Sequence, residues 1–193
     1  MALPNVTDLD LNEARVLLRV DFNVPVDAAG AITDDNRIRA ALPTIRYLQE
    51  RRCKIVICSH MGRPKDAPDP AYRLRPAAEA LGELLGRPVR SLEQTVGPEV
   101  EAACRALAPG EVLLLENLRF GPGEKRNDPA FADALARLAD VYVNDAFGTA
   151  HRAAASVVAI AERLPAFAGR LMERELSVLG QALEAARRPF VVI

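Results

Sequence analysis

The sequence predicts an α/β fold: a doubly wound, Rossmann-like parallel sheet in three layers, with helices on both faces. Short apolar runs rich in Val, Ile and Leu recur with little alternation, which is typical of strands buried on both faces. Stretches with helical spacing of apolar residues separate these runs. Because parallel neighbours need crossover connections, the order strand, helix, strand, helix indicates a sheet covered by its own helices.

The expected strands are short aliphatic runs at residues 15–20, 53–58, 112–116, 139–143 and 189–193. Apolar residues follow the spacing of one helix face in five other stretches, at residues 36–51, 74–85, 98–107, 129–138 and 170–188. Pro43 interrupts the first of these helical patterns. Residues 60–72 and 121–129 are rich in Pro and Gly, and they are expected to be loops that follow strands.

A second domain is expected to begin near the end of the sequence. The long helical pattern at 170–188 stops before Pro189, and an apolar run follows it. We therefore expect a first domain over residues 1–169, an interdomain helix over 170–188, and the first strand of a truncated domain over 189–193. On this interpretation the chain is a fragment.

Composition bounds the class of protein. The chain has 193 residues, is 50% hydrophobic and carries a formal net charge of −1. Such a balance gives no global basic field for nucleic acid or acidic membranes, and no apolar run approaches the length of a membrane span. Cys53, Cys58 and Cys104 lack C-x-x-C spacing and are expected to be small core residues, which fits a reduced, cytoplasmic protein.

Polar residues follow the expected strands at the end where an open parallel sheet binds its ligand. Arg63, Arg119 and Arg152 each lie just beyond a strand, and Arg37 begins the helix after the first strand. Guanidinium groups that converge repel one another unless an anion lies between them, and their geometry matches phosphate oxygens. The predicted ligand is a small, multiply charged phosphate ester. For any single arginine a surface salt bridge is the commoner role, so their joint placement carries the prediction.

Other candidates lie at the same edge. Asp21 and Asn23 can hydrogen-bond a ligand hydroxyl, although an Asx turn or a helix cap uses the same residues. The chain has two histidines, and each lies near an arginine in sequence: His60 near Arg63, and His151 beside Arg152. The sequence has no G-x-x-x-x-G-K-[ST] loop, no G-x-G-x-x-G motif in a strand–helix context and no zinc-ligand spacing. No nucleotide or metal site is therefore expected in this chain.

Five ordered motifs resemble the N-terminal domain of phosphoglycerate kinases. They are residues 19–25 (RVDFNVP), 37–45 (RIRAALPTI), 59–64 (SHMGRP), 115–120 (LENLRF) and 143–152 (VNDAFGTAHR). The resemblance implies two α/β domains. The first binds 3-phosphoglycerate or 1,3-bisphosphoglycerate, and the missing C-terminal domain binds ADP or ATP with Mg²⁺ in cis. It also implies a glycolytic kinase that is a monomer when full length.

The resemblance also implies residue roles. Asp21, Asn23 and His60 would contact the carboxylate and hydroxyl end of the glycerate, and the phosphate would be held by Arg63, Arg119 and Arg152. The remaining substrate-binding positions of these motifs are Phe22, Met61 and Gly62. Arg37 would also bind substrate and is the expected catalytic residue, because phosphoryl transfer needs cationic stabilisation of its transition state. No general base is required, since the attacking carboxylate is ionised at neutral pH.

Two positions depart from the family pattern. Ala154 stands where a second histidine is common, which removes one basic group and predicts weaker affinity. Met61 replaces a leucine, a mild change. The expected chain binds substrate but is inactive alone. The alternatives are a non-catalytic phosphate-ester-binding or regulatory module and, with least support, a structural domain that has lost its site.

Overall fold

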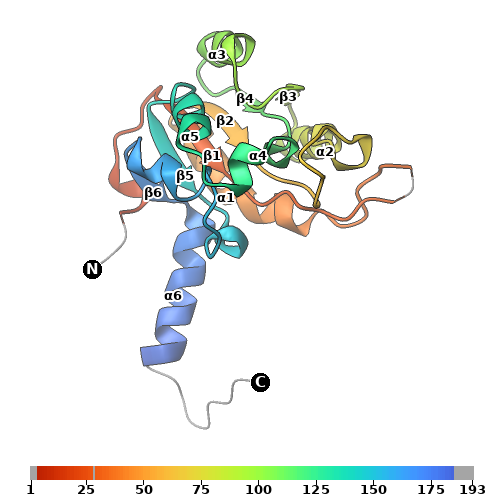
Figure 1. The fold of residues 1–193 in the computed structure, drawn as a ribbon. Coiled ribbons are helices and arrows are strands. Elements are labelled where there is room, and N and C mark those ends of the chain that lie inside the picture. Colours follow the sequence, from red (N-terminus) through yellow and green to blue (C-terminus); the bar gives the residue numbers. More distant parts are fainter. Residues whose placement is uncertain (1–3, 28, 185–193) are drawn as a thin grey trace.

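The computed structural model describes residues 4–27 and 29–184. It contains one parallel sheet of six strands in the order β3-β4-β2-β1-β5-β6 (Figure 1). The strands are β1 (Arg15–Arg19), β2 (Lys54–Cys58), β3 (Arg90–Ser91), β4 (Val112–Leu114), β5 (Val141–Asn144) and β6 (Ala166–Ala168). The helices are α1 (Asn36–Glu50), α2 (Arg75–Leu85), α3 (Pro98–Arg105), α4 (Pro122–Lys125), α5 (Pro129–Ala136) and α6 (Arg170–Glu184). The predicted α/β class is confirmed.

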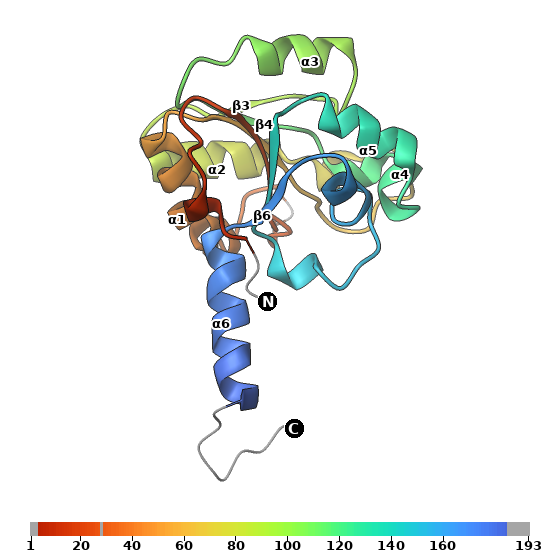
Figure 2. The same ribbon diagram turned by 90° about the vertical axis from the view of Figure 1, so that its left-hand side faces the viewer.

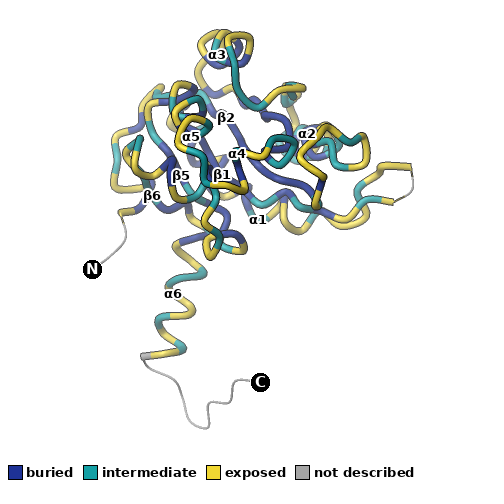
Figure 3. Tube along the Cα trace, viewed as in Figure 1, coloured by how far each residue is buried: buried dark blue, intermediate teal, exposed yellow. Residues whose placement is uncertain are grey.

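The two faces of the sheet carry separate cores, because successive side chains of a strand point to opposite faces. Val16 and Leu18 of β1 pack with α1 and α2, whereas Leu17 packs with α3 and α5. Figure 2 shows α1 and α2 on one side of the sheet and α4 and α5 on the other. Both cores consist of side chains excluded from water, as the dark central strands in Figure 3 indicate. The sheet is therefore the middle layer of three.

Some elements differ from the expectation. The four predicted strands that lie within the described residues appear within two residues of their expected bounds, and the run at 189–193 lies outside those residues. β3 and β6, of two and three residues, were not predicted; β4 also has three residues but lies in the longer aliphatic run 112–115. α4 forms inside the expected loop at 121–129. α1 continues through Pro43, which lacks only the N–H that would bond the carbonyl four residues earlier.

α6 leaves the body of the domain, as Figures 1 and 2 both show. Its first turn packs near α1 and β6, whereas Val178 is 57% exposed and Leu183 is 76% exposed. The apolar face expected for this helix is thus packed in its first turn, whereas Val178, Leu179 and Leu183 further along have no packing partner among the described residues. None of the helices in that part of the chain is both long and apolar enough to cross a membrane.

Candidate anion-binding site

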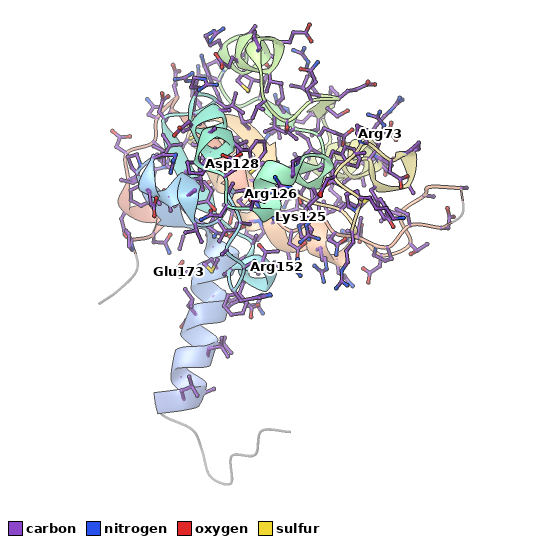
Figure 4. The ribbon with its side chains drawn as sticks, viewed as in Figure 1. Arg73, Lys125, Arg126, Asp128, Arg152 and Glu173 are labelled. Atoms are coloured by element: carbon purple, nitrogen blue, oxygen red, sulfur yellow. The ribbon has the colours of Figure 1, made fainter. Side chains whose placement is uncertain are left out.

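The carboxyl ends of β1, β2, β4 and β5 meet at one edge of the sheet, because all four strands are parallel neighbours. The segments that follow them carry every residue that the sequence analysis selected, apart from Arg37 on α1. A cavity of about 350 Å³ opens among these segments. Its charged lining residues are Arg19, Arg63, Arg119, Glu124, Lys125 and Arg152. In Figure 4, Lys125 and Arg152 lie on the side of the domain turned to the viewer.

The three predicted phosphate arginines therefore come together around one cavity. None of Arg63, Arg119 and Arg152 pairs with a carboxylate within residues 4–27 and 29–184, although most other arginines there do. Burial lowers the pKa of Arg119, and the nearby Arg152 and Arg19 lower it further. The positive charges in this cavity thus outnumber the single carboxylate in its lining, Glu124, as an anion site requires.

The loop that carries Arg63 is fixed from both sides. Arg119 Nη1 donates to the Gly62 carbonyl at 2.7 Å, and Lys125 Nζ donates to the Pro64 carbonyl at 3.0 Å. Lys125 also pairs with Asp66, with 2.6 Å between Nζ and Oδ1. The two carbonyls that flank Arg63 are thus both held by cations from the segment after β4.

Asn117 makes four side-chain hydrogen bonds, three of them to the same loop. Its Oδ1 accepts from the N–H groups of Met61 and Arg119, and its Nδ2 donates to the carbonyls of Met61 and Tyr72. The neighbouring Glu116 carboxylate is buried and accepts from Arg73 Nη1 and the Leu74 N–H. A fully satisfied amide of this kind fixes backbone positions, so Asn117 fastens the His60–Arg63 turn to β4.

Gly62 is required by the shape of this turn. Its φ is +59°, and a Cβ atom there would lie 2.3 Å from the Tyr72 ring. The Gly62 N–H donates to Asn23 Oδ1 at 2.8 Å, which ties the turn to the segment after β1. The side chains of Phe22 and Met61 are buried in the core beneath it. Asn23 therefore ties this turn, which carries the lining residue Arg63, to the segment after β1, while Phe22 and Met61 support it from inside.

Two buried polar residues lie next to each other beside the cavity: Arg19 contributes to its lining, whereas His60, like Asp21 and Asn23, does not. Arg19 is 2% exposed, and its Nη2 lies 3.1 Å from His60 Nδ1. Burial lowers the pKa of His60 to about 2, and the positive charges of Arg19, Arg119, Arg152 and Arg37 add to the effect. His60 is therefore neutral at physiological pH, and its 3.9 Å approach to Asp21 Oδ1 is not an ion pair.

Arg37 lies outside this cavity. Its guanidinium pairs with the Asp21 carboxylate, and both residues line a neighbouring hollow of about 310 Å³ beside α6. The side chain of Arg37 is 52% exposed. Of the four arginines that the sequence placed at this edge, three thus share the cavity and the fourth stands beside it with a carboxylate partner.

Several site residues were not selected from the sequence. Arg19 had a usable signal, because a charged residue at the end of a strand buried on both faces needs a buried partner. Glu116 and Asn117 stand in a quoted motif but received no role. Glu124 and Lys125 lay in a segment expected to be a loop, and nothing local distinguishes them from surface charges. Residues 4–27 and 29–184 contain no group of three His, Cys, Asp or Glu side chains that could hold a metal.

The sequence model of the family described as phosphoglycerate kinase matches residues 6–193. The phosphoglycerate kinase of Moorella thermoacetica is 58% identical over 193 residues, which cover 100% of this chain and 49% of that protein. The phosphoglycerate kinase of Thermomicrobium roseum is 57% identical over 188 residues, which cover 97% and 48%.

Solved structures give the same result for the fold. The phosphoglycerate kinase of Pyrococcus horikoshii has a TM-score of 0.89 and 36% identity, covering 97% of this chain and 47% of that one. The structure of phosphoglycerate kinase from Coxiella burnetii has a TM-score of 0.85 at 36% identity, with the same coverage. The chain spans about half the length of the curated relatives it matches.

Proposed function

The chain belongs to the phosphoglycerate kinase family, and we propose that it is the half of such an enzyme that binds 3-phosphoglycerate or 1,3-bisphosphoglycerate. On this proposal residues 1–169 are the N-terminal substrate domain, and residues 170–188 form the helix that leads to the nucleotide domain. The run at 189–193, which lies outside the described residues, would belong to that domain. The intact enzyme transfers a phosphoryl group from 1,3-bisphosphoglycerate to ADP.

The observation that carries the proposal is the charge of the cavity. Its lining has five cationic side chains and one carboxylate, and the three arginines from the family motifs lack carboxylate partners among the described residues. A space of about 350 Å³ suits a small phosphate ester. Bidentate contact from Arg63, Arg119 and Arg152 to phosphate oxygens would relieve the repulsion among them.

The carboxylate and hydroxyl end of the substrate would contact Asp21, Asn23 and His60. Asn23 Oδ1 already accepts from the Gly62 N–H, which leaves the amide NH₂ of Asn23 to donate. His60 Nδ1 accepts from Arg19, so the imidazole can donate from Nε2. The neutral His60 and the Asn23 amide would thus hold the glycerate by hydrogen bonds, while the arginines supply the charge.

Arg37 is the proposed catalytic residue. Charge spreads over the equatorial oxygens of the phosphoryl group in the transition state, and a guanidinium can stabilise it. Arg37 is half exposed, as a residue must be if it acts on a group delivered by another part of the protein. Asp21 would orient its guanidinium until then. The substrate carboxylate attacks as an anion, so no general base is assigned.

The nucleotide lies outside this chain in the proposal. ADP or ATP with Mg²⁺ would bind to the other half of the full-length protein in cis, and that protein would act as a cytoplasmic monomer. The buried free thiols of Cys53, Cys58 and Cys104 support a reducing compartment. We expect this chain alone to give no phosphoryl transfer above blank when 1,3-bisphosphoglycerate and MgADP are supplied, and sustained turnover would contradict that part.

Calorimetric titration of the 193-residue chain with 3-phosphoglycerate at low salt tests the binding proposal. Glycerate, which lacks the phosphate, is the control ligand. Saturable binding that needs the phosphate is the expected result. No heat from a sample that circular dichroism shows to be folded would overturn the proposal for this chain, whereas equal binding of glycerate would reject the phosphate role of the arginines.

A further inference from the structure

A buried row of polar groups runs beneath the cavity, from α4 to the end of β2. The Glu124 carboxylate accepts from both the N–H and the hydroxyl of Ser156, at 3.0 and 2.6 Å. Ser156 Oγ accepts from Arg19 Nε at 2.9 Å, and Arg19 Nη2 lies 3.1 Å from His60 Nδ1. All four side chains are buried, none more than 4% exposed. The row therefore joins three segments that follow different strands.

Arg19 is unusual within this row because its counter-charge is not in contact with it. A guanidinium removed from water needs a compensating charge and filled hydrogen-bond donors. Its Nη1 donates to the Val20 carbonyl, and Ser156 fills Nε. Glu124 supplies the negative charge from behind the serine hydroxyl. Because no carboxylate covers Arg19 directly, its positive charge still faces the cavity.

The position of Arg19 decides the state of His60. A guanidinium nitrogen can only donate, so Nδ1 of His60 must accept and the single ring proton must be on Nε2. A loose Arg19 would remove that constraint, and the imidazole would exchange between tautomers. The hydrogen-bond donor that His60 offers to a ligand thus depends on the groups that hold Arg19 in place.

We propose that Glu124, acting through Ser156, is a positioning residue of the cavity: it holds the Arg19 guanidinium in place and thereby fixes His60 as the Nε2–H tautomer. The ligand part of this inference rests on the proposed binding of 3-phosphoglycerate. The tautomer part does not, since it concerns the chain without ligand.

Nitrogen NMR of the chain labelled with ¹⁵N-histidine tests the tautomer directly. The sequence has only two histidines, so the exposed His151 supplies an internal reference. In the unsubstituted chain we expect His60 as a single Nε2–H tautomer. Glu124→Gln and Ser156→Ala should both move its ring nitrogens toward an exchanging mixture. Unchanged His60 signals in both variants would overturn the proposal.

Tyr142→Phe is the matched control for a loosened loop. The Tyr142 hydroxyl donates to the carbonyl of Ser156 at 2.7 Å, so its loss weakens the same backbone but leaves the serine hydroxyl in place. We expect the His60 tautomer to survive Tyr142→Phe even if stability falls. Ser156→Thr keeps a hydroxyl and should also retain the tautomer. A tautomer lost in these two variants as readily as in Ser156→Ala would mean that any disturbance suffices, which contradicts a specific role for Glu124.

Affinity provides the second measurement. With 3-phosphoglycerate as the probe, Ser156→Ala and Glu124→Gln should weaken calorimetric binding about tenfold, because a charge-assisted contact loses its geometry. Tyr142→Phe should change affinity less than twofold. If the unsubstituted chain does not bind 3-phosphoglycerate but shows the expected tautomer pattern, the proposed function fails while the positioning role stands. Binding that is intact in the variants, with the tautomer lost, would refute the link to affinity.

Discussion

Two hollows lie side by side at the same edge of the sheet, and their charges are opposite. The cavity around Arg63, Arg119 and Arg152 has five cations and one carboxylate in its lining. The hollow beside α6 has one cation, Arg37, and the three carboxylates of Asp21, Asp145 and Glu175. Both are built from loops after parallel strands and the helices next to them. The cavity and the hollow therefore occupy the same edge of the sheet, and the placement of carboxylates decides which of the two can hold an anion.

The difference lies in where each carboxylate stands. In the hollow, Asp21 contacts Arg37 directly and neutralises it. In the cavity, the Glu124 carboxylate is hydrogen-bonded to Ser156 and reaches Arg19 only through the serine hydroxyl. A carboxylate one hydroxyl away lowers the cost of burying the arginine but leaves its charge available. A basic cavity in a chain of net charge −1 thus combines five cationic lining residues with one carboxylate that forms no ion pair with them.

The largest effect should come from the turn that carries the lining residue Arg63. Gly62→Ala places a Cβ atom 2.3 Å from the Tyr72 ring at a φ of +59°. Gly86→Ala, at the C-terminal end of α2, has a similar φ of +67° with nothing within 4 Å. We expect Gly62→Ala to lower the free energy of unfolding by about 3 kcal/mol and Gly86→Ala by about 1 kcal/mol. Urea denaturation followed by circular dichroism measures both.

The two Gly variants share the backbone strain, so their difference isolates the clash with Tyr72. Equal losses would show that Tyr72 swings aside at no cost and that the turn is not rigid. A glycine variant that is less stable but binds 3-phosphoglycerate normally would separate the stability of the turn from its role in the site.

The second prediction concerns Arg119, which lines the cavity, and Arg37, which lines the hollow. Arg119→Ala removes an uncompensated cation and its bond to the Gly62 carbonyl, and affinity for 3-phosphoglycerate should fall by about 2 kcal/mol, roughly thirtyfold. Arg37→Ala removes a cation already paired with Asp21, and the loss should be less than about fivefold. Isothermal titration calorimetry of both variants gives the ratio. Similar losses would mean that Arg37 joins the phosphate-binding group once ligand is present.

The sequence predicted the fold well because β1, β2, β4 and β5 lie in aliphatic runs that are easily recognised. Their aliphatic runs and the helices between them leave few alternatives, whereas the two residues of β3 and the three of β6 exist only because β4 and β5 offer edges to pair with. α1 kept its length despite Pro43 because its buried face outweighs one missing hydrogen bond. Tertiary pairing and packing, which no local pattern encodes, decided these elements.

The residues of the site likewise fall into those that the sequence could predict and those that it could not. Residues such as Arg63 and Arg119 could be selected because they stand directly after strands. The residues that hold them could not, since Asn117, Glu124 and Lys125 act through contacts between segments distant in sequence. The sequence analysis placed Arg37 at the start of a helix and assigned it a catalytic role, but it did not predict that Arg37 lines a separate hollow. That separation depends on Asp21 reaching α1, which is a matter of side-chain geometry.

A smaller effect concerns the neutral histidine on the cavity side. Burial and nearby arginines lower the pKa of His60 to about 2, so below pH 6.5 the unfolded chain takes up a proton that the folded chain excludes. The stability contributed by neutral His60 is therefore present above about pH 6.5 and is lost as the pH falls toward 2. His60→Gln should lessen the loss of stability between pH 6.5 and 4.5 by about 1–2 kcal/mol. Urea titrations across this range measure it, with His151→Gln as the exposed control. A profile unchanged by His60→Gln would show that His60 becomes protonated without unfolding.

The smallest effect concerns Asp145 in the hollow. The pKa of this residue is raised, whereas that of His60 is lowered. Burial raises the pKa of this carboxyl, although hydrogen bonds from the Leu171 and Met172 N–H groups at the start of α6 favour the charged form. Its Oδ2 is buried and has no partner among the described residues. A raised pKa means that the stability gained from the neutral form is complete below the unfolded-state pKa and is lost as the pH rises through the folded-state pKa. Asp145→Asn, which imitates the neutral form, should therefore raise the free energy of unfolding at pH 7 by about 1 kcal/mol and change little near pH 3.5.

Asp140→Asn is the matched control, because Arg15 lowers the pKa of Asp140 and its loss should destabilise the chain at pH 7. Urea unfolding at the two pH values distinguishes the cases. If Asp145→Asn also destabilises at pH 7, the ionised carboxylate at the N-terminus of α6 is worth more than its burial costs. The negative charge in the hollow would then stabilise α6, whereas the positive charge of the cavity is proposed to bind a ligand.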